Sequence, residues 1–262
     1  MYDRHLSVHN LPEVVDEREL VGSTVIVVDL LRATTTICQA LASGAGAVVP
    51  FREIDEALAA TEKAGRRQVV LGGERGGRRI DGFDLGNSPS EYTPEAVGGR
   101  RVLITTSNGT KALYHARLAR RVVIGAFVNL SAVAASVKDE PRIDILCAGT
   151  DGRETREDIL AAGAIASTLR ERSADRWHTN EAANAALREW KNVLAKAAAS
   201  GRPVNEQLAI EFRDAPGGRN LLEIGLDDDL VDCAQVDRLD VVPELDVRPW
   251  RIVLPDGGKR PC

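Results

Sequence analysis

The stretch TVIVVDLLRATTTICQAL, residues 24–41, decides the fold. Its first five residues are all β-branched and do not alternate with polar residues, which is typical of a strand buried on both faces. After a short polar turn, apolar residues recur at helical spacing from Ala33 to Leu41. Because a buried strand, a turn and a helix form the repeating unit of parallel sheets, the stretch predicts an α/β protein.

The same unit recurs along the first two-thirds of the chain. Further apolar runs lie at 47–51, 68–71, 101–106, 122–126 and 143–147. All but the second lead into helical patterns, at 54–64, 108–117, 130–137 and 155–170. The expected N-cap of the helix at 130–137 is Asn129 or Ser131. We therefore expect the fold class α/β, with a largely parallel or mixed sheet sandwiched by helices in a three-layer α/β/α arrangement.

The last third of the chain has a different character. From about residue 173 it is rich in Ala, Glu, Arg and Lys, which predicts helices. We expect a long helix at 175–200 and shorter helices at 205–213 and 219–232, with Gly217-Gly218 between the two shorter ones. The segment 238–254 is expected to add a strand at a sheet edge.

No linker marks a domain boundary. The expected organisation is a single domain over residues 1–254, either undivided or as subdomains 1–170 and 171–254. Residues 255–262 are expected to be a flexible tail.

Composition narrows the classes of function. The chain has 262 residues, 44% hydrophobic and 28% charged, which are ordinary values for a globular enzyme. Its net charge is -5 and no run of Lys and Arg stands out, so we expect no nucleic-acid partner. The N-terminus lacks the apolar region of a signal peptide and no stretch is long enough to span a bilayer. We expect a cytoplasmic protein without a membrane partner.

Cysteine and histidine usage argues against a zinc site. The four cysteines include no CxxC pair, and with four histidines no cluster has the spacing of zinc ligands. Cys38 and Cys233 fit buried positions on helices. His5 and His9 share one face of a possible N-terminal strand and are expected to be structural.

Functional side chains gather directly after the predicted strands, where ligands bind in open α/β sheets. After the first strand come Asp29, Arg32 and the three hydroxyls of Thr34, Thr35 and Thr36. Free N–H groups and hydroxyls at a helix start suit an anion, and a guanidinium suits phosphate. The alternative is that these threonines only cap the helix.

Two further turns have a similar character. In GGERGG, 72–77, glycine pairs bracket Glu74 and Arg75, so a ligand can approach the backbone closely. The spacing fits neither a dinucleotide fingerprint nor a Walker A loop, and a flexible surface loop is the alternative. In TTSNGTK, 105–111, a small polar turn before a helix and Lys111 predict an anion cradle, with an Asn-Gly turn as the alternative.

The fourth turn, CAGTDGRETRED at 147–158, contains a second possible phosphatase chemistry. Cys147 and Arg153 have the CxxxxxR spacing of cysteine-dependent phosphatases. Such a cysteine needs an electropositive loop, whereas Asp151 and Glu154 should raise the pKa of this thiol. The acids suit a cation instead, or a capping box of Thr155 with Asp158.

Taken together, the turns combine carboxylates with cationic side chains. They supply Asp29, Glu74, Asp84 and Asp151 beside Arg32, Arg75 and Lys111. A hard divalent cation with oxygen ligands and a polyanionic substrate need that mixture, so we expect magnesium-assisted transfer of a phosphoryl group to water. The DxDx[TV] motif of aspartyl-phosphate enzymes is missing, because Leu31 stands two residues after Asp29. Asp29 therefore fits a metal ligand better than a nucleophile.

These motifs together resemble the 2-phosphosulfolactate phosphatase family. The resemblance rests on VVDLLRATTTI (27–37), GGERGG with GFDLGNSPSEYT (82–93), TTSNGTKAL (105–113) and CAGTDG with EDILAAGA (157–164). It covers residues 20–164, and the last third of the chain matches less distinctively. The resemblance implies a phosphoric monoester hydrolase that uses Mg²⁺ to convert (2R)-phospho-3-sulfolactate to 3-sulfolactate and phosphate, a step in coenzyme M biosynthesis.

A small, anionic, phosphorylated hydroxy acid is therefore the expected partner, and the predicted residues fall into three groups. The expected metal ligands are Asp29, Glu74 and Asp151. The expected catalytic residues are Asp29, Arg32, Glu74, Arg75 and Lys111. The expected phosphate-binding or anion-binding residues are Thr34, Thr35, Asn87, Ser107, Asn108, Gly109 and Thr110.

Two alternatives remain open at this point. The enzyme could act on another 2-phospho-hydroxy acid, or the chain could be a non-catalytic binder of a phosphorylated metabolite. A homo-oligomer is also expected, because the Ala-rich helix at 175–200 can bury an interface as readily as it can pack on the core.

Overall fold

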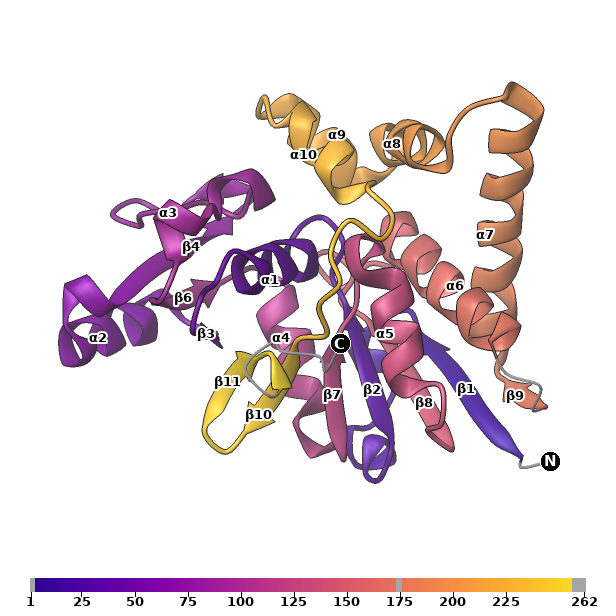
Figure 1. Cartoon of the computed structure of the whole chain (residues 1–262), viewed down its shortest axis with the longest axis horizontal. Helices are drawn as coiled ribbons and strands as arrows, with labels where there is room; N and C mark the ends of the chain where they lie inside the picture. Colours follow the sequence, from indigo (N-terminus) through magenta and orange to yellow (C-terminus); the bar gives the residue numbers. More distant parts are fainter. Residues whose placement is uncertain (1–2, 173–175, 256–262) are drawn as a thin grey trace.

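The structure, a computed structural model, describes residues 3–172 and 176–255 and is built around one sheet (Figure 1). In the described residues the sheet has eleven strands in the order β5-β4-β6-β3-β11-β10-β7-β2-β8-β1-β9. The strands are β1 (Arg4–His9), β2 (Thr24–Val28), β3 (Ala47–Pro50), β4 (Val69–Arg75), β5 (Arg78–Arg79), β6 (Arg101–Thr105), β7 (Arg121–Ile124), β8 (Arg142–Cys147), β9 (Trp177–Thr179), β10 (Glu244–Val247) and β11 (Trp250–Val253).

Helices flank this sheet, which confirms the predicted α/β/α class (Figure 1). They are α1 (Ala33–Ala42), α2 (Ile54–Ala64), α3 (Pro94–Val97), α4 (Gly109–His115), α5 (Leu130–Val137), α6 (Arg156–Glu171), α7 (Glu181–Ser200), α8 (Val204–Asp214), α9 (Pro216–Glu223) and α10 (Asp227–Cys233). The bounds of α2 and α5 agree with the sequence prediction. Asn129 occupies the N-cap position of α5, as predicted, but its side chain makes no capping hydrogen bond there, because it accepts from the N–H of Ala126 and donates to Ile124 O.

The sheet consists of two parallel halves joined by an antiparallel hairpin. β4, β6 and β3 form one half, and β7, β2, β8, β1 and β9 form the other. Between them β10 pairs antiparallel with β7, and β11 pairs antiparallel with β3. The prediction of one edge strand at 238–254 is therefore wrong, because this segment forms two strands and both lie inside the sheet. The hairpin lies inside the sheet because Leu245 and Ile252 are buried in the main core.

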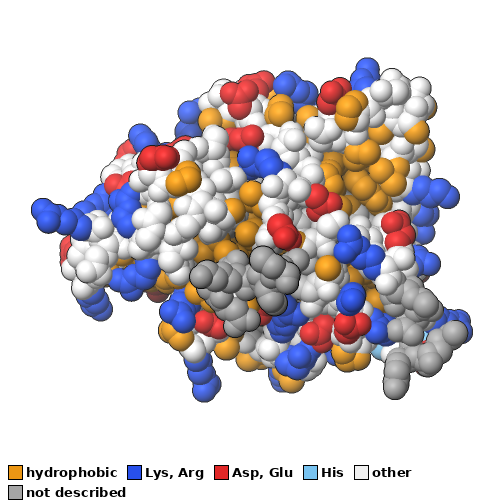
Figure 2. Space-filling model, viewed as in Figure 1, with side chains coloured by type: hydrophobic (Ala, Val, Ile, Leu, Met, Phe, Trp, Pro, Cys, Tyr) orange, Lys and Arg blue, Asp and Glu red, His pale blue; other side chains and the backbone are white. Residues whose placement is uncertain are grey.

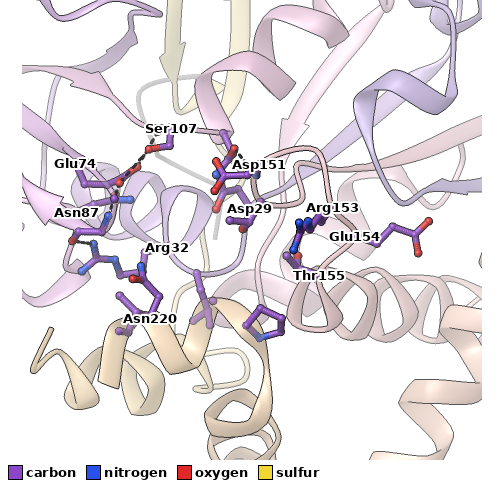
Figure 3. A pocket seen from close by; sticks show the side chains of 18 residues that line it. Asp29, Arg32, Glu74, Asn87, Ser107, Asp151, Arg153, Glu154, Thr155 and Asn220 are labelled. Carbon is purple, nitrogen blue, oxygen red and sulfur yellow. Dashed lines mark hydrogen bonds between the residues drawn. The ribbon is translucent and has the colours of Figure 1, made fainter. Parts of the chain in front are cut away.

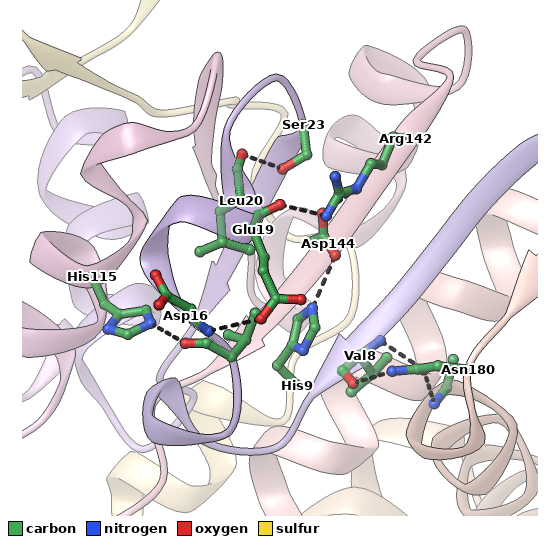
Figure 4. Close-up of polar contacts among 12 residues, drawn as sticks. Val8, His9, Asp16, Glu19, Leu20, Ser23, His115, Arg142, Asp144 and Asn180 are labelled. Atoms are coloured by element: carbon green, nitrogen blue, oxygen red, sulfur yellow. Dashed lines mark hydrogen bonds and ion pairs between the residues drawn. The ribbon is translucent and has the colours of Figure 1, made fainter.

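The C-terminal third differs from its prediction in three further places, one of which is that residues 219–232 form parts of α9 and α10 instead of one helix. Residues 177–179 form β9 beside β1, so α7 begins at Glu181 instead of residue 175. Asn180 fixes this start: its Oδ1 accepts from the N–H of Ala183, and its Oδ1 and Nδ2 bind the main chain of Val8 (Figure 4). Gly217 and Gly218 do not separate two helices, because they lie in the first turn of α9.

One hydrophobic cluster joins both parts of the chain. It includes Leu6 and Ile26 from the first part and Phe212, Leu221 and Ile252 from the last third. A smaller second cluster lies under α2. The division into subdomains and the tail stay predictions, and residues 256–262 of that tail lie outside the described residues.

The histidines of the described chain make structural contacts. His9 Nε2 lies 2.9 Å from Asp144 Oδ1, and the other carboxylate oxygen pairs with Arg142 (Figure 4). His115 Nε2 lies 2.8 Å from the carbonyl oxygen of Val15. These contacts agree with the structural role expected for His9.

The surface carries charges of both signs. On the face shown in Figure 2, Lys and Arg side chains are spread around the rim, with Asp and Glu between them. Hydrophobic side chains gather where α7 meets α8, the helices that carry the exposed Leu194 and Ile210. The homo-oligomer stays a prediction. Among the described helices, none combines the length and the apolar character needed to cross a bilayer.

Candidate functional site

A pocket of about 630 Å³ opens at the carboxyl ends of β2, β4, β6 and β8 (Figure 3). This is the sheet edge at which ligands bind in parallel α/β folds. Its lining comes from the end of β4, from the loops after the strands and from α9, which contributes Pro216, Gly217, Asn220 and Leu221. The other lining residues are Asp29, Leu31, Arg32, Glu74, Gly76, Gly77, Asn87, Ser107, Asn108, Thr150, Asp151, Arg153, Glu154 and Thr155.

Asp29 lies directly after β2, and its carboxyl group is in an unfavourable electrostatic environment. Its side chain lines the pocket, although only 8% of the residue is exposed. Burial, followed by the charges of Asp158 and Glu74, raises the pKa of this carboxyl well above its usual value. A carboxylate held in such surroundings gains from a bound cation or a proton.

Glu74 lies within strand β4 and not in the loop that the sequence predicts. The first glycine pair, Gly72 and Gly73, belongs to β4, and the turn is made by Gly76-Gly77 on the way into β5. Glu74 therefore projects from a strand. Its carboxylate accepts hydrogen bonds from the N–H groups of Ser107 at 2.7 Å and Gly77 at 2.8 Å. It thus ties the turn after β6 to the β4–β5 hairpin.

Arg32 lines the pocket from a fully buried position. Its Nη1 donates to Asp229 Oδ2 at 2.5 Å and to Ser88 Oγ at 3.1 Å. Its Nη2 donates to the carbonyl oxygen of Gly77 at 2.6 Å. The guanidinium is therefore fixed in place by acceptors from three separate segments.

The threonines of α1 are occupied by the main chain. Thr34 Oγ1 donates to Asp29 O, Thr35 Oγ1 to Leu30 O and Thr36 Oγ1 to Asn87 O. All three are buried, and the lining of the pocket does not include them. In the structure these hydroxyls shape the turn after β2, and the anion-binding role of Thr34 and Thr35 stays a prediction.

The turn after β6 brings small polar groups to the pocket. Ser107 and Asn108 line it, whereas Thr110 is buried, and its hydroxyl donates to Thr106 O. Gly109 begins α4 against Asp29, because a Cβ there would lie 2.7 Å from Asp29 Oδ2. The start of α4 can approach the carboxylate only with glycine at this position.

Asn87 supplies an unsatisfied polar atom at the pocket. It is 3% exposed, and its Oδ1 is a buried side-chain oxygen without a hydrogen-bond partner in the described structure. Its own carbonyl oxygen is bound by Thr36. An orphaned buried amide is costly unless something binds it, so Asn87 is a candidate ligand-binding residue.

The turn after β8 places Asp151 and Arg153 at the pocket. Asp151 has φ of 51°, and its N–H donates to Asn108 Oδ1 at 3.3 Å. Thr155 occupies the N-cap position of α6, but its side chain makes no capping hydrogen bond and forms no capping box with Asp158. The Asp158 carboxylate instead accepts hydrogen bonds from the N–H groups of Leu30 and Gly149, which links the turns after β2 and β8.

Two predicted catalytic residues lie away from the pocket. Arg75 follows Glu74 on the same strand and points the other way, where its guanidinium donates to Thr105 Oγ1 at 2.9 Å and to Arg52 O. Lys111 is exposed on the outer side of α4. Neither is among the lining residues, so neither side chain joins the carboxylates of Asp29 and Glu74 in the pocket.

Sequence reasoning missed the contribution of the last third of the chain. Asn220 and Gly217 of α9 line the pocket, and Asp229 of α10 holds Arg32. In the sequence, Arg153 stands out only as part of the CxxxxxR motif that begins at Cys147. The one local signal of this contribution in the sequence is the Pro216-Gly217-Gly218 segment, because glycines allow close packing. The structure agrees, since a Cβ at Gly217 would lie 2.3 Å from Glu157 Oε1.

The donors available for a cation are carboxylates. Asp29, Glu74 and Asp151 line the same pocket, as expected for oxygen ligation. In residues 3–172 and 176–255, however, no three His, Cys, Asp or Glu side chains are grouped closely enough to hold a metal ion. The magnesium site stays a prediction.

Cys147 has the environment of a structural thiol. It is fully buried at the end of β8, and burial with the charges of Asp158 and Glu154 raises its pKa well above the usual value. It does not line the pocket. Both findings favour the rejection of a cysteine nucleophile.

Alkylation should therefore leave the folded protein active. We expect iodoacetamide to leave Cys38, Cys147 and Cys233 unmodified in the native state, because all three thiols are buried and burial raises the pKa of each. Peptide mass mapping should show all three modified after unfolding in guanidinium. Rapid native labelling of Cys147 with loss of activity would restore the cysteine mechanism. Cys262 lies outside the described residues.

Comparison with known proteins gives one consistent result. Residues 9–247 match the family model described as 2-phosphosulpholactate phosphatase. A relative named probable 2-phosphosulfolactate phosphatase from Caldanaerobacter subterraneus subsp. tengcongensis is 37% identical over 232 residues, which cover 88% of this chain and 91% of the relative. Relatives of the same name from Symbiobacterium thermophilum (39% identity, 86% and 92% covered) and Synechocystis sp. (35%, 90% and 94%) are similar over comparable lengths.

Proposed function

This chain belongs to the 2-phosphosulfolactate phosphatase family, and on that premise we propose that it hydrolyses (2R)-phospho-3-sulfolactate to 3-sulfolactate and phosphate with the help of Mg²⁺. The observation that carries the proposal is the pocket at the strand ends. It brings the carboxylates Asp29, Glu74 and Asp151 to the same cavity as the guanidinium groups of Arg32 and Arg153. A polyanionic substrate with a divalent cation requires both kinds of group.

The carboxylates are the residues that would hold the cation. Mg²⁺ bound there would neutralise charge on the phosphoryl oxygens and polarise the phosphorus for attack by water. Asp29 fits this role best, because burial and neighbouring carboxylates disfavour its ionised form unless a cation is near. Glu74 also has a positioning role, since it holds the main chain of Ser107 and Gly77.

The remaining lining residues divide between the anionic groups of the substrate. We assign the phosphoryl oxygens to Arg32, whose fixed guanidinium stabilises charge without reorganising during the reaction. We assign the same oxygens to Arg153, because it lines the pocket whereas Arg75 and Lys111 do not. Ser107, Asn108 and the side-chain N–H group of Asn87 are assigned to the carboxylate or sulfonate, because an anion needs hydrogen-bond donors.

The test is phosphate release from racemic 2-phospho-3-sulfolactate, measured with Mg²⁺ and with EDTA beside phospholactate and p-nitrophenyl phosphate. We expect release that depends on Mg²⁺ and is fastest from the sulfonated substrate. Release from phospholactate alone would assign the enzyme to another 2-phospho-hydroxy acid. Thermal stabilisation by the substrate without any release of phosphate would identify a binder, and undiminished activity in EDTA would exclude the metal.

A further inference from the structure

A buried ion pair connects the pocket to the last third of the chain. Asp229 lies in the first turn of α10 and is 2% exposed. Its Oδ2 lies 2.5 Å from Arg32 Nη1 and accepts a hydrogen bond from Ser88 Oγ at 2.8 Å. Ser88 Oγ also accepts from Arg32 Nη1 at 3.1 Å, so the three side chains form a closed set of contacts.

These contacts define which part of the Arg32 guanidinium is free for a ligand. A guanidinium has five N–H donors. Within the described residues, Asp229, Ser88 and Gly77 O take three of them. The two remaining N–H donors are available to a ligand, because the Arg32 side chain lines the pocket. This side chain is nearly fully buried, so the contacts on its other side set the direction of these donors.

We infer that Asp229 is a positioning residue, which holds Arg32 at the angle needed to bind a phosphate group. Asp229 is not among the lining residues of the pocket and acts only through Arg32. The inference rests on the proposed function, since it takes the phosphoryl group as the ligand of Arg32. It gives α10, a helix 197 positions away from Arg32 in sequence, a part in substrate binding.

Stability alone explains this pair poorly. A buried ion pair loses the hydration of both charges, so its net contribution to stability is often close to zero. The pair lies beside the pocket, where a fixed cation is useful for binding an anion. The chain also contains a comparable buried carboxylate, Asp144, which is 1% exposed, binds His9 and Arg142 and does not line the pocket.

Asp229→Asn with Asp144→Asn as matched control tests the inference. Asparagine keeps the shape of the side chain but removes the charge that orients Arg32. We expect Asp229→Asn to raise both the KM and the dissociation constant for inorganic phosphate by about tenfold, the loss typical of one charge-assisted hydrogen bond. Asp144→Asn should change both by less than about twofold, even if it lowers the melting temperature equally.

A double-mutant cycle separates positioning from a general effect on the fold. In an Arg32→Gln background, Asp229→Asn should no longer change phosphate affinity, because the residue through which it acts is gone. Equal effects in both backgrounds would overturn the inference. If Asp229→Asn does not fold, Ser88→Ala decides: it should weaken phosphate binding by several-fold, and unchanged binding would overturn the inference.

Calorimetric measurement of phosphate binding, together with the assay of phosphate release, distinguishes failure of the proposed function from failure of the positioning role of Asp229. A wild-type protein that binds phosphate but releases none from the sulfonated substrate would contradict the proposed function alone. A wild-type protein that releases phosphate while Asp229→Asn binds it normally would contradict this inference alone.

Discussion

Replacing Asp29 with asparagine should lower kcat by about a thousandfold while the protein stays folded. Asp29 is the predicted metal ligand at the end of β2, and its carboxylate lines the pocket. Burial and the charges of Asp158 and Glu74 disfavour the ionised carboxyl in the absence of a cation. The amide removes that repulsion with little change in shape. We therefore expect a free energy of unfolding equal to or above that of the wild type when no metal is added.

The measurement pairs turnover with urea unfolding, both with and without Mg²⁺. Mg²⁺ should stabilise the wild type and leave Asp29→Asn unchanged. Asp84→Asn is the control, because Asp84 is another carboxylate singled out in the sequence, but it binds Leu71 N–H and Arg66 and does not line the pocket. The control should lose stability and keep its kcat. Near-normal turnover of Asp29→Asn would remove Asp29 from the active site.

Strand ends could be predicted from the sequence, and with them the position of the pocket. The β-branched run before Asp29 is β2, and Asp29 follows it at the expected sheet edge. The same reasoning placed Ser107, Asn108 and Asp151 at one site, because the carboxyl ends of parallel strands meet. Glu74 joined them for a different reason, since it projects from a strand and not from a loop.

Side-chain direction explains the two cationic residues that lie elsewhere. Adjacent residues of a strand point to opposite faces, so Glu74 at the pocket places Arg75 against Thr105. The prediction treated 72–77 as a loop and could not use this alternation. Lys111 lies two residues after Gly109, and that spacing takes it to the exposed side of α4.

The contacts that the last third of the chain makes with the site could not be predicted. Nothing local in the segment around Asp229 shows that α10 packs behind Arg32, and for α9 the glycine pair Gly217-Gly218 indicates close packing without showing against what. The hairpin of β10 and β11 was misplaced for the same reason. The sequence of a short apolar strand is similar whether the strand lies at the edge of a sheet or in its interior. The hairpin lies between β3 and β7, which only the tertiary structure shows.

Gly73→Ala should destabilise the protein by about 4 kcal/mol, a cost that combines backbone strain with overpacking. Gly73 has φ of 143°, a region that other residues rarely adopt. A Cβ at this position would lie 2.0 Å from the carbonyl oxygen of Thr105 on the neighbouring strand. The methyl group therefore forces β4 away from β6, the two strands whose ends carry Glu74 and Ser107.

Gly82→Ala is the control that separates backbone strain from overpacking. Urea unfolding measures the stability of both variants. Gly82 also has a positive φ, 81°, but a Cβ there meets no atom within 4 Å. Its substitution should cost only about 1 kcal/mol, the strain of a left-handed residue. If the two variants lose the same stability, the close approach of β4 to Thr105 is absent in solution. The larger loss for Gly73 would instead show that this glycine holds together the two strands on which the pocket is built.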